Sequence, residues 1–372
     1  MFHPTAGSTS ASGTAVFVTE TVRELARRQP AYLYTQRGRL SADLRRSAVE
    51  VVEIERDPYW ERLRRFAGRL PVNLRRISAQ LSSSTSVFVN ALLDGTVAHI
   101  ERNVDVLFTH HMGEAMFLSN VVDVPVVRVM HGCRLVGIGA KTVPRVSRLA
   151  GTVANSRQTA AEMSEKLGND ADGIVYPGVR AEEFDPGRTP AFERDGFVVM
   201  FVGRFHESKG VYDLLEAFAR LPEEARLSLV GRGDAERLRE RIDSLGIGER
   251  VTVEGEVAHD RLPHYYVAAD VACLPSHYES FGMANLEAMA CGTPVVTTDL
   301  PGIREYATHG RTSLLVPPGD VDALAEGLSR LMASAELRER LGDAGRDVAE
   351  RYSWRETAAG FSRFSEDVLE RR

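Results

Sequence analysis

Short apolar runs alternate with amphipathic segments along the second half of the chain. The apolar runs predict strands at residues 197–202, 225–230, 250–254, 270–274, 294–298 and 313–316. Segments whose apolar residues recur every three or four positions predict helices between them, at 209–221, 235–245, 261–269 and 283–291. This alternation indicates a parallel sheet with helices on both faces, and such sheets bind ligands at the carboxyl ends of their strands.

The first half of the chain shows a looser version of the same pattern. Helices are expected at 15–28 and 157–167, and strands at 31–35, 49–54, 104–109, 124–131 and 151–155. After Asp320 the pattern is helical to the end of the sequence. We therefore expect an α/β protein with domains at 1–185 and 186–352, followed by a helix within 353–372.

Composition narrows the class of protein. The chain has 372 residues, which is enough for two domains of ordinary size, and its net charge of −6 argues against general nucleic-acid binding. The three cysteines, Cys133, Cys273 and Cys291, match no zinc-binding spacing and suit a reducing compartment. No apolar run approaches the ~18 residues of a membrane span and no signal peptide is evident, so a cytoplasmic protein is expected.

Residues 276–294 carry the clearest candidate chemistry. Glu279 and Glu287 flank Gly282 at the point where a predicted strand turns into a helix. The free N–H groups and the dipole of a helix N-terminus attract phosphate. A carboxylate one turn inside the helix can accept hydrogen bonds from a vicinal diol such as a ribose. Together these features predict a sugar-nucleotide pocket.

Arg204 and Lys209 form a second candidate group, just after the first strand of the second domain. They lie five residues apart across a strand-to-helix turn, so both can reach the same edge of the sheet. A planar guanidinium and a point-charge ammonium suit a diphosphate. We expect these cations to take the place of a metal, and a pair of surface basic residues is the alternative.

The sequence around the two glutamates resembles a known family. Glu279 and Glu287, separated by seven residues and followed by Ala-Met-Ala-Cys-Gly-Thr-Pro-Val-Val, resemble the signature of the retaining glycosyltransferases of family 4. The resemblance covers roughly residues 197–355 and extends more loosely over the first half. It implies the GT-B fold, in which two Rossmann-like domains with parallel sheets face a central cleft and a terminal helix crosses back to the first domain.

The resemblance also implies roles for side chains. Arg204 and Lys209 would neutralise the diphosphate as it leaves, Glu279 would contact the transferred sugar, and Glu287 would bind the donor ribose. His131 closes a predicted strand of the first domain and would orient hydroxyl groups of the donor sugar rather than act as a nucleophile. A packed or capping histidine is the alternative for His131.

Main-chain groups complete the predicted donor site. The resemblance implies that Gly282, Met283 and Ala284 donate N–H groups to phosphate or sugar, and that Val257 brackets the base. Gly203 follows a strand at the same sheet edge, where glycine lets the backbone approach a ligand closely. Polar residues at strand ends of the first domain are further candidates: His110 or His111, Asn155 and Ser156.

The start of the chain departs from the family pattern. The family begins with an apolar strand and a loop with adjacent glycines, whereas here Phe2 and His3 lead directly into a loop with separate glycines at Gly7 and Gly13. A first strand that is missing or reduced to two residues would leave apolar edges exposed on its neighbours. This departure puts the integrity of the acceptor domain in question.

Residues 59–80 form a basic, amphipathic segment with six arginines against one glutamate. Trp60 and Phe66 belong to its apolar stripe. Two interpretations stay open. One is peripheral contact with an anionic membrane, at its inner face, and the other is a solvated basic surface.

The sequence thus predicts a metal-independent, retaining glycosyltransferase. It would move a hexose from a UDP-, GDP- or ADP-sugar to a glycan or lipid-linked acceptor, with no further cofactor. Two alternatives stay open. A sugar-nucleotide epimerase of the same architecture would release free nucleotide or epimer rather than glycoside, and a non-catalytic relative would bind sugar nucleotide and transfer nothing.

Overall fold

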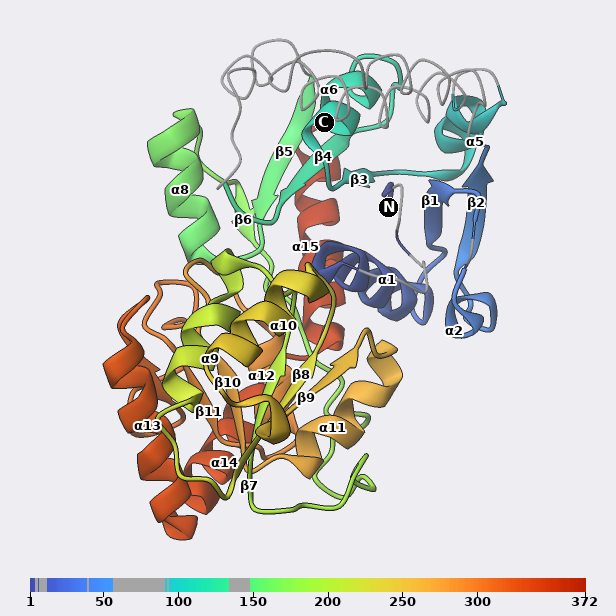
Figure 1. Cartoon of the computed structure of the whole chain (residues 1–372). Helices are drawn as coiled ribbons and strands as arrows, with labels where there is room; N and C mark the ends of the chain where they lie inside the picture. Colours follow the sequence, from blue (N-terminus) through green and yellow to red (C-terminus); the bar gives the residue numbers. More distant parts are fainter. Residues whose placement is uncertain (4–5, 7–11, 39, 56–90, 92–93, 134–147) are drawn as a thin grey trace, which may run out of the picture. The chain divides into compact units, whose positions relative to one another are not determined.

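The computed structural model describes residues 1–3, 6, 12–38, 40–55, 91, 94–133 and 148–372 (Figure 1). The basic segment at 59–80 lies outside the described residues. The chain forms two compact units, one made of Met1–Tyr176 with Trp354–Arg372 and the other of Pro177–Ser353. Among the described residues, no helix combines the length and the apolar composition that a membrane span requires.

The second unit is built on a six-stranded parallel sheet with the order β12-β11-β10-β7-β8-β9. Its strands are β7 (Phe197–Val202), β8 (Ala225–Val230), β9 (Val251–Gly255), β10 (Val271–Leu274), β11 (Val295–Thr298) and β12 (Leu314–Val316). Each strand begins within one residue of its predicted start. The prediction succeeds because strands buried on both faces are continuous apolar runs, which are easy to recognise.

Helices α9 (Val211–Phe218), α10 (Ala235–Ser244) and α13 (Val321–Ala333) contribute leucines to one large core cluster with this sheet. Helices α11 (Leu262–Ala268), α12 (Met283–Ala290) and α14 (Ala335–Ala349) pack beside one another and against β7, β10 and β11. The helix predicted at 209–221 begins later than expected. A short 3-10 turn, η1 (Glu207–Lys209), precedes Gly210, whose φ of +66° separates it from α9. Lys209 therefore ends this 3-10 turn and precedes α9.

The first unit has parallel strands in two groups, β1-β2 and β3-β4-β5-β6. Their bounds are β1 (Tyr32–Gln36), β2 (Glu50–Ile54), β3 (Leu107–Thr109), β4 (Val126–Met130), β5 (Leu149–Ala154) and β6 (Gly173–Ile174). Phe2 joins the groups through parallel bridges to Tyr34 and Thr109. Its N–H donates to Phe108 O at 2.8 Å, and its side chain is fully buried. The first strand is thus shortened, but the expectation of exposed apolar edges is wrong, because Phe2 pairs with both neighbours.

The helices of the first unit are α1 (Gly13–Ala26), α2 (Ala42–Arg45), α5 (Thr96–Asn103), α6 (Met112–Leu118), α8 (Arg157–Leu167) and the C-terminal α15 (Trp354–Glu370). The ring of Phe17 in α1 lies 5.7 Å from Trp354 and 6.0 Å from Phe361, centroid to centroid. Helix α15 also approaches the sheet closely, since a Cβ on Gly151 would lie 3.0 Å from the Phe364 ring. The C-terminal helix is therefore part of the first unit's core.

Candidate functional site

The strand order of the second unit reverses between β7 and β10. Strands β8 and β9 follow on the side of β7, whereas β11 and β12 follow on the side of β10. Open parallel sheets bind ligands beyond the carboxyl ends of their strands at such a reversal point. The loop after β7 carries Arg204 and Lys209, and the loop after β10 carries Glu279. The topology therefore brings together the two groups that the sequence singled out separately.

Lys209 and Glu279 form an ion pair at this point. Lys209 Nζ lies 2.5 Å from Glu279 Oε1, and Ser276 Oγ donates to the same oxygen at 2.9 Å. The main chain ties the two loops together, because His277 N donates to Ser208 O at 3.1 Å. Ser276 opens the motif that contains both glutamates, but its type and position alone do not predict this role.

Arg204 lies in the segment after β7 that also carries Lys209, and it is available to a ligand. Gly203 N donates to Val230 O at 2.9 Å and Phe205 N donates to Arg232 O at 2.8 Å, so the loop extends the pairing between β7 and β8. Arg204, between these anchors, is exposed. Within the described part of the chain its guanidinium makes no ion pair or hydrogen bond with a side chain. It can therefore bind an anion without first breaking an internal contact.

The glycines at the ends of β7, β8 and β9 serve close backbone packing. Gly231 N donates to Gly255 O at 2.7 Å. A Cβ on Gly231 would lie 1.7 Å from Gly203 O, and its φ of +145° disfavours other residues as well. These loops therefore lie directly against one another, which explains the glycine at position 231 without a ligand.

Helix α12 begins with free backbone donors. Gly282 precedes it in the left-handed conformation, with φ +81° and ψ +59°, and no side chain caps the helix. The N–H groups of Met283 and Ala284 have no hydrogen-bond acceptor in the part of the chain that the structure describes. Such unpaired donors, together with the helix dipole, attract an anion.

Glu287 lies one turn into α12 and is only 7% exposed. His259 Nε2 lies 2.9 Å from its Oε1, and the Tyr266 hydroxyl donates to its Oε2 at 3.3 Å. Burial, and then the charge of Glu287, raise the pKa of Tyr266 well above its usual range, so Tyr266 remains a donor. Each carboxylate oxygen can accept a further hydrogen bond, which leaves capacity for ligand hydroxyl groups.

Neither partner of Glu287 was predicted from the sequence. His259 begins the 3-10 turn η3 (His259–Arg261), and Tyr266 lies on the buried face of α11. Neither element carries a recognisable motif, and only the fold reveals the contact. Val257, predicted to bracket a base, is partly buried in the loop that leads from β9 to His259.

His131 follows β4 in the first unit, is partly buried and belongs to a histidine cluster. His110 Nδ1 lies 2.9 Å from His131 Nε2, and the two rings stack at 5.2 Å. Burial, followed by the charge of His111, lowers the pKa of His131 to about 3, and burial lowers that of His110 well below its usual value. His111 is exposed whereas His110 is buried, as alternation along the chain predicts. His3, which the sequence analysis did not single out, lies 4.7 Å from the His111 ring.

Of the two other polar candidates of the first unit, Ser156 caps a helix and Asn155 lies next to it. Ser156 Oγ accepts from Thr159 N at 3.0 Å at the start of α8. Asn155 Oδ1 accepts from Thr159 Oγ1 at 2.7 Å. Both residues are buried, and the capping role accounts for Ser156.

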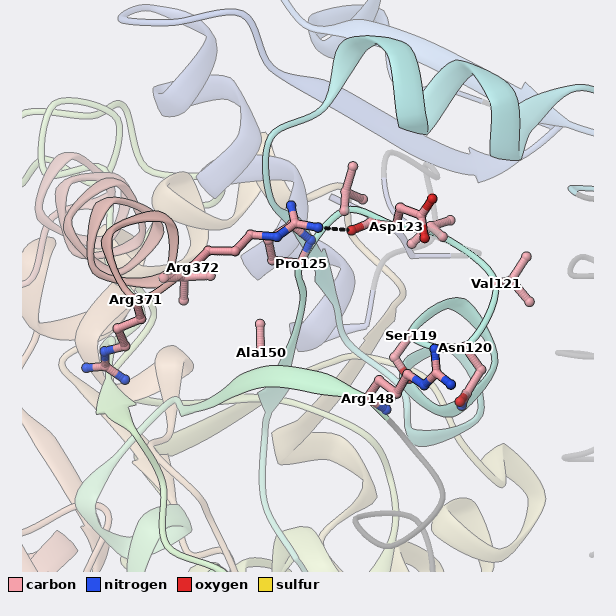
Figure 2. Close-up of a pocket in the computed structure, with 12 residues that line it drawn as sticks. Ser119, Asn120, Val121, Asp123, Pro125, Arg148, Ala150, Arg371 and Arg372 are labelled. Carbon is pink, nitrogen blue, oxygen red and sulfur yellow. Dashed lines mark hydrogen bonds between the residues drawn. The ribbon is translucent and has the colours of Figure 1, made fainter.

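A cavity of about 370 Å³ opens at a different place in the first unit (Figure 2). Arg148, Arg371 and Arg372 lie around it, and Arg372 donates to the main-chain oxygen of Asp123 at 2.5 Å. It lies at the amino ends of β4 and β5, whereas His131 follows the carboxyl end of β4. The cavity is therefore separate from the predicted site residues.

Residues 188–348 match the family described as "Glycosyl transferases group 1". A D-inositol 3-phosphate glycosyltransferase from Xylanimonas cellulosilytica is 32% identical over 95% of this chain and 91% of its own length. A phosphatidyl-myo-inositol mannosyltransferase from Mycobacterium leprae is 32% identical over 81% of this chain and 83% of its own length.

Solved structures share the fold over the full length of the chain. Anabaena HepE in complex with UDP and glucose superposes with a TM-score of 0.79 at 18% identity, covering 98% of this chain and 97% of that one. A sucrose-phosphate synthase from Thermosynechococcus elongatus gives a TM-score of 0.80 at 21% identity, covering 100% and 98%.

Proposed function

The chain belongs to the glycosyl transferases group 1, the family-4 glycosyltransferases of GT-B fold, and from this premise we propose its reaction and the roles of its residues. It is a glycosyltransferase that takes its sugar from a nucleotide sugar. We propose that it moves a hexose from a nucleoside diphosphate sugar to an acceptor hydroxyl and retains the anomeric configuration.

The charged cluster between β7 and β10 is the observation that carries this proposal. Arg204, Lys209 and the free N–H groups of Met283 and Ala284 supply positive charge and donors at one edge of the sheet. Transfer breaks the bond between the anomeric carbon and a phosphate oxygen, and negative charge grows on that oxygen. Preorganised cations and donors stabilise such a charge more strongly as it develops, which lowers the barrier.

The remaining groups hold the sugar and the nucleoside. Glu287 accepts hydrogen bonds from the ribose hydroxyls, while His259 and Tyr266 keep its carboxylate in place. Glu279 contacts the transferred sugar and eases positive charge at the anomeric carbon. His131 binds a hydroxyl of that sugar as a neutral group, Val257 brackets the base, and Gly203 and Gly282 line the backbone of the site.

The acceptor oxygen attacks the anomeric carbon on the face that the leaving phosphate occupied. As the new bond forms, the acceptor hydroxyl passes its proton to the leaving phosphate oxygen, so no protein base is required. In this scheme Arg204 and Lys209 provide the charge compensation at the diphosphate that a metal would otherwise provide.

The relatives guide the choice of substrates. Because two relatives are named for inositol phosphate and phosphatidylinositol acceptors, the first acceptors to test are inositol phosphates and phosphatidylinositol. UDP-glucose is a natural first donor, since HepE was solved with UDP and glucose, and GDP-mannose is the second, since one relative is a mannosyltransferase.

A thermal-shift panel of UDP-glucose, GDP-mannose and ADP-glucose tests the donor. A ligand that binds only the native state raises the free energy of unfolding by mass action, and the Tm rises with it. At a ligand concentration of one hundred times Kd, the gain in unfolding free energy is about 2.7 kcal/mol. The stabilising donor is then incubated with each acceptor, and the anomeric configuration of the product is read by NMR. A donor that binds but is never transferred would favour the non-catalytic alternative, and release of an epimer without acceptor would favour the epimerase.

A further inference from the structure

The carbonyl of Gly282 is held by two donors from inside the second unit. The Tyr306 hydroxyl donates to Gly282 O at 3.1 Å, and Asn285 N donates to the same oxygen at 3.0 Å. No cis peptide bond occurs among the described residues, so the C=O and N–H of the peptide that joins Gly282 to Met283 point in opposite directions. Holding the oxygen inward therefore turns the N–H of Met283 outward.

The direction of the Tyr306 hydrogen bond is fixed by its neighbours. Asn285 Nδ2 donates to the Tyr306 hydroxyl at 3.1 Å and to Thr297 Oγ1 at 3.2 Å. An amide nitrogen can only donate, so the phenol oxygen accepts there and its single hydrogen is directed to Gly282 O. Burial raises the pKa of Tyr306 well above its usual range, so the hydroxyl keeps this hydrogen.

The phenol is rigid enough to define the position of the glycine. Tyr306 is 6% exposed, and its ring lies 5.1 Å from Phe281 and 6.1 Å from Tyr352. A Cβ on Gly282 would lie 3.1 Å from the Tyr306 hydroxyl and 2.6 Å from Ile303 Cδ1. Gly282 thus packs directly against the buried side chains of Ile303 and Tyr306, and the Tyr306 hydroxyl donates a hydrogen bond to its carbonyl.

We propose that Tyr306 is a positioning residue that aims the N–H of Met283 at the diphosphate of the donor. The inference rests on the proposed function and adds a residue to it. Glycine imposes little restriction on the rotation of the peptide that follows it, so an unsupported Gly282 would let this peptide turn its N–H away. The hydroxyl of Tyr306 opposes that rotation from a position that the ligand does not touch.

Tyr306→Phe tests the proposal, with Tyr352→Phe as the matched control. Both tyrosines belong to the same ring cluster, and each hydroxyl donates to a main-chain oxygen at 3.1 Å, that of Gly282 for Tyr306 and that of Glu305 for Tyr352. Each variant keeps the ring and removes one hydrogen bond from a hydroxyl to a main-chain oxygen, so both are expected to lower the Tm. Tyr306→Phe also removes the acceptor of Asn285 Nδ2 and is expected to lower the Tm more, whereas Tyr352→Phe keeps the hydrogen bond from Tyr306 to the Gly282 carbonyl.

The measurement is kcat and KM for transfer or hydrolysis of whichever of UDP-glucose, GDP-mannose and ADP-glucose stabilises the wild type, below the melting range of all three proteins. Tyr306→Phe is expected to lower kcat about tenfold, less than outright loss of a donor, and to change KM by less than about twofold. Tyr352→Phe is expected to keep the wild-type kcat.

Each other outcome is decisive. An unchanged kcat in Tyr306→Phe, or an equal fall in both variants, would overturn the positioning role while the proposed function stands. A wild type that binds and processes none of the three donors would overturn the proposed function, and the inference with it.

Discussion

Lys209 Nζ and Glu279 Oε1 lie 2.5 Å apart, although 70 positions separate the two residues in the sequence. One follows β7 and the other follows β10, the two strands between which the sheet order reverses. The lysine that we propose for the diphosphate is therefore held in place by the glutamate that we propose for the sugar. Before the donor binds, Glu279 keeps the flexible lysine chain at the strand edge, which reduces the entropy lost on binding.

Lys209→Ala is expected to lower the rate of sugar transfer strongly and the free energy of unfolding only slightly. The pair is partly exposed, with side-chain exposures of 25% and 21%, so solvent screens it and its loss should cost about 0.5–1 kcal/mol. Transfer should fall about 10²–10³-fold, because a cation at the developing charge is lost. Lys166→Ala is the control, since it removes a comparable ion pair to Glu162 on α8. Steady-state kinetics and urea melts of both variants check this, and equal activity losses would contradict it.

Glu287→Gln is expected to raise KM for the donor more than it lowers kcat. The ribose lies away from the bond that breaks, so its contacts are made equally in the ground state and the transition state. A hydrogen bond to a charged group contributes about 1.5–3 kcal/mol, which corresponds to roughly 10–100-fold in KM. Glu254→Gln in β9 serves as the control, because it removes the charge of another carboxylate, which accepts from the Ser228 hydroxyl. A kcat effect alone would argue against ribose binding.

Gly282→Ala is expected to damage both stability and activity. The residue has φ +81°, which costs an L-residue about 1–2 kcal/mol, and the new Cβ would lie 2.6 Å from Ile303 Cδ1. Gly319→Ala is a matched control, because Gly319 has φ +77° and no atom within 4 Å of a built Cβ. The difference in unfolding free energy between the two variants isolates the clash. Equal values would show that Ile303 moves aside without cost.

The strands of the second unit were predictable because parallel strands buried on both faces are continuous apolar runs. The start of the helix near Lys209 was not predictable, because it depends on a contact between Gly210 and Pro275, which lie far apart in the sequence. A Cβ on Gly210 would lie 1.9 Å from Pro275 O, so the segment after β10 requires a glycine at this position. The left-handed conformation of this glycine interrupts the helix between η1 and α9. Helices α5 and α6 were not predicted from the sequence, although α11 and α12, which are equally short, were.

Some residues of the candidate site were likewise predictable from the sequence and others were not. The positions of Arg204, Lys209, Glu279 and Glu287 at one strand edge follow from local motifs, since the ends of parallel strands meet at that edge. His259 on Glu287, and the histidine partner of His131, depend on contacts between separate elements that have no local signature. The pairing of Phe2 with both of its neighbours likewise depends on contacts between separate elements and could not be predicted locally.

The histidine cluster gives the first unit a defined pH dependence of stability. Burial lowers the pKa of His3 to about 2 and that of His131 to about 3, so both rings are neutral in the folded protein at neutral pH. In the unfolded chain they bind protons below about pH 6.5. Their contribution is therefore fully present above that pH and is lost as the pH falls towards 3, by up to about 1.4 kcal/mol per pH unit for each ring.

Glu114 acts in the opposite direction. Burial raises the pKa of this fully buried carboxyl well above its usual value, so its contribution is present at low pH and declines as the pH rises above about 4.3. His131→Asn should therefore flatten the fall in unfolding free energy between pH 7 and pH 5, and Glu114→Gln should steepen it. Urea melts at several pH values measure both slopes, with His206→Asn at an exposed position as the control. Parallel curves for all three variants and the wild type would refute the assignment, because a group whose pKa is the same in both states cannot change the slope.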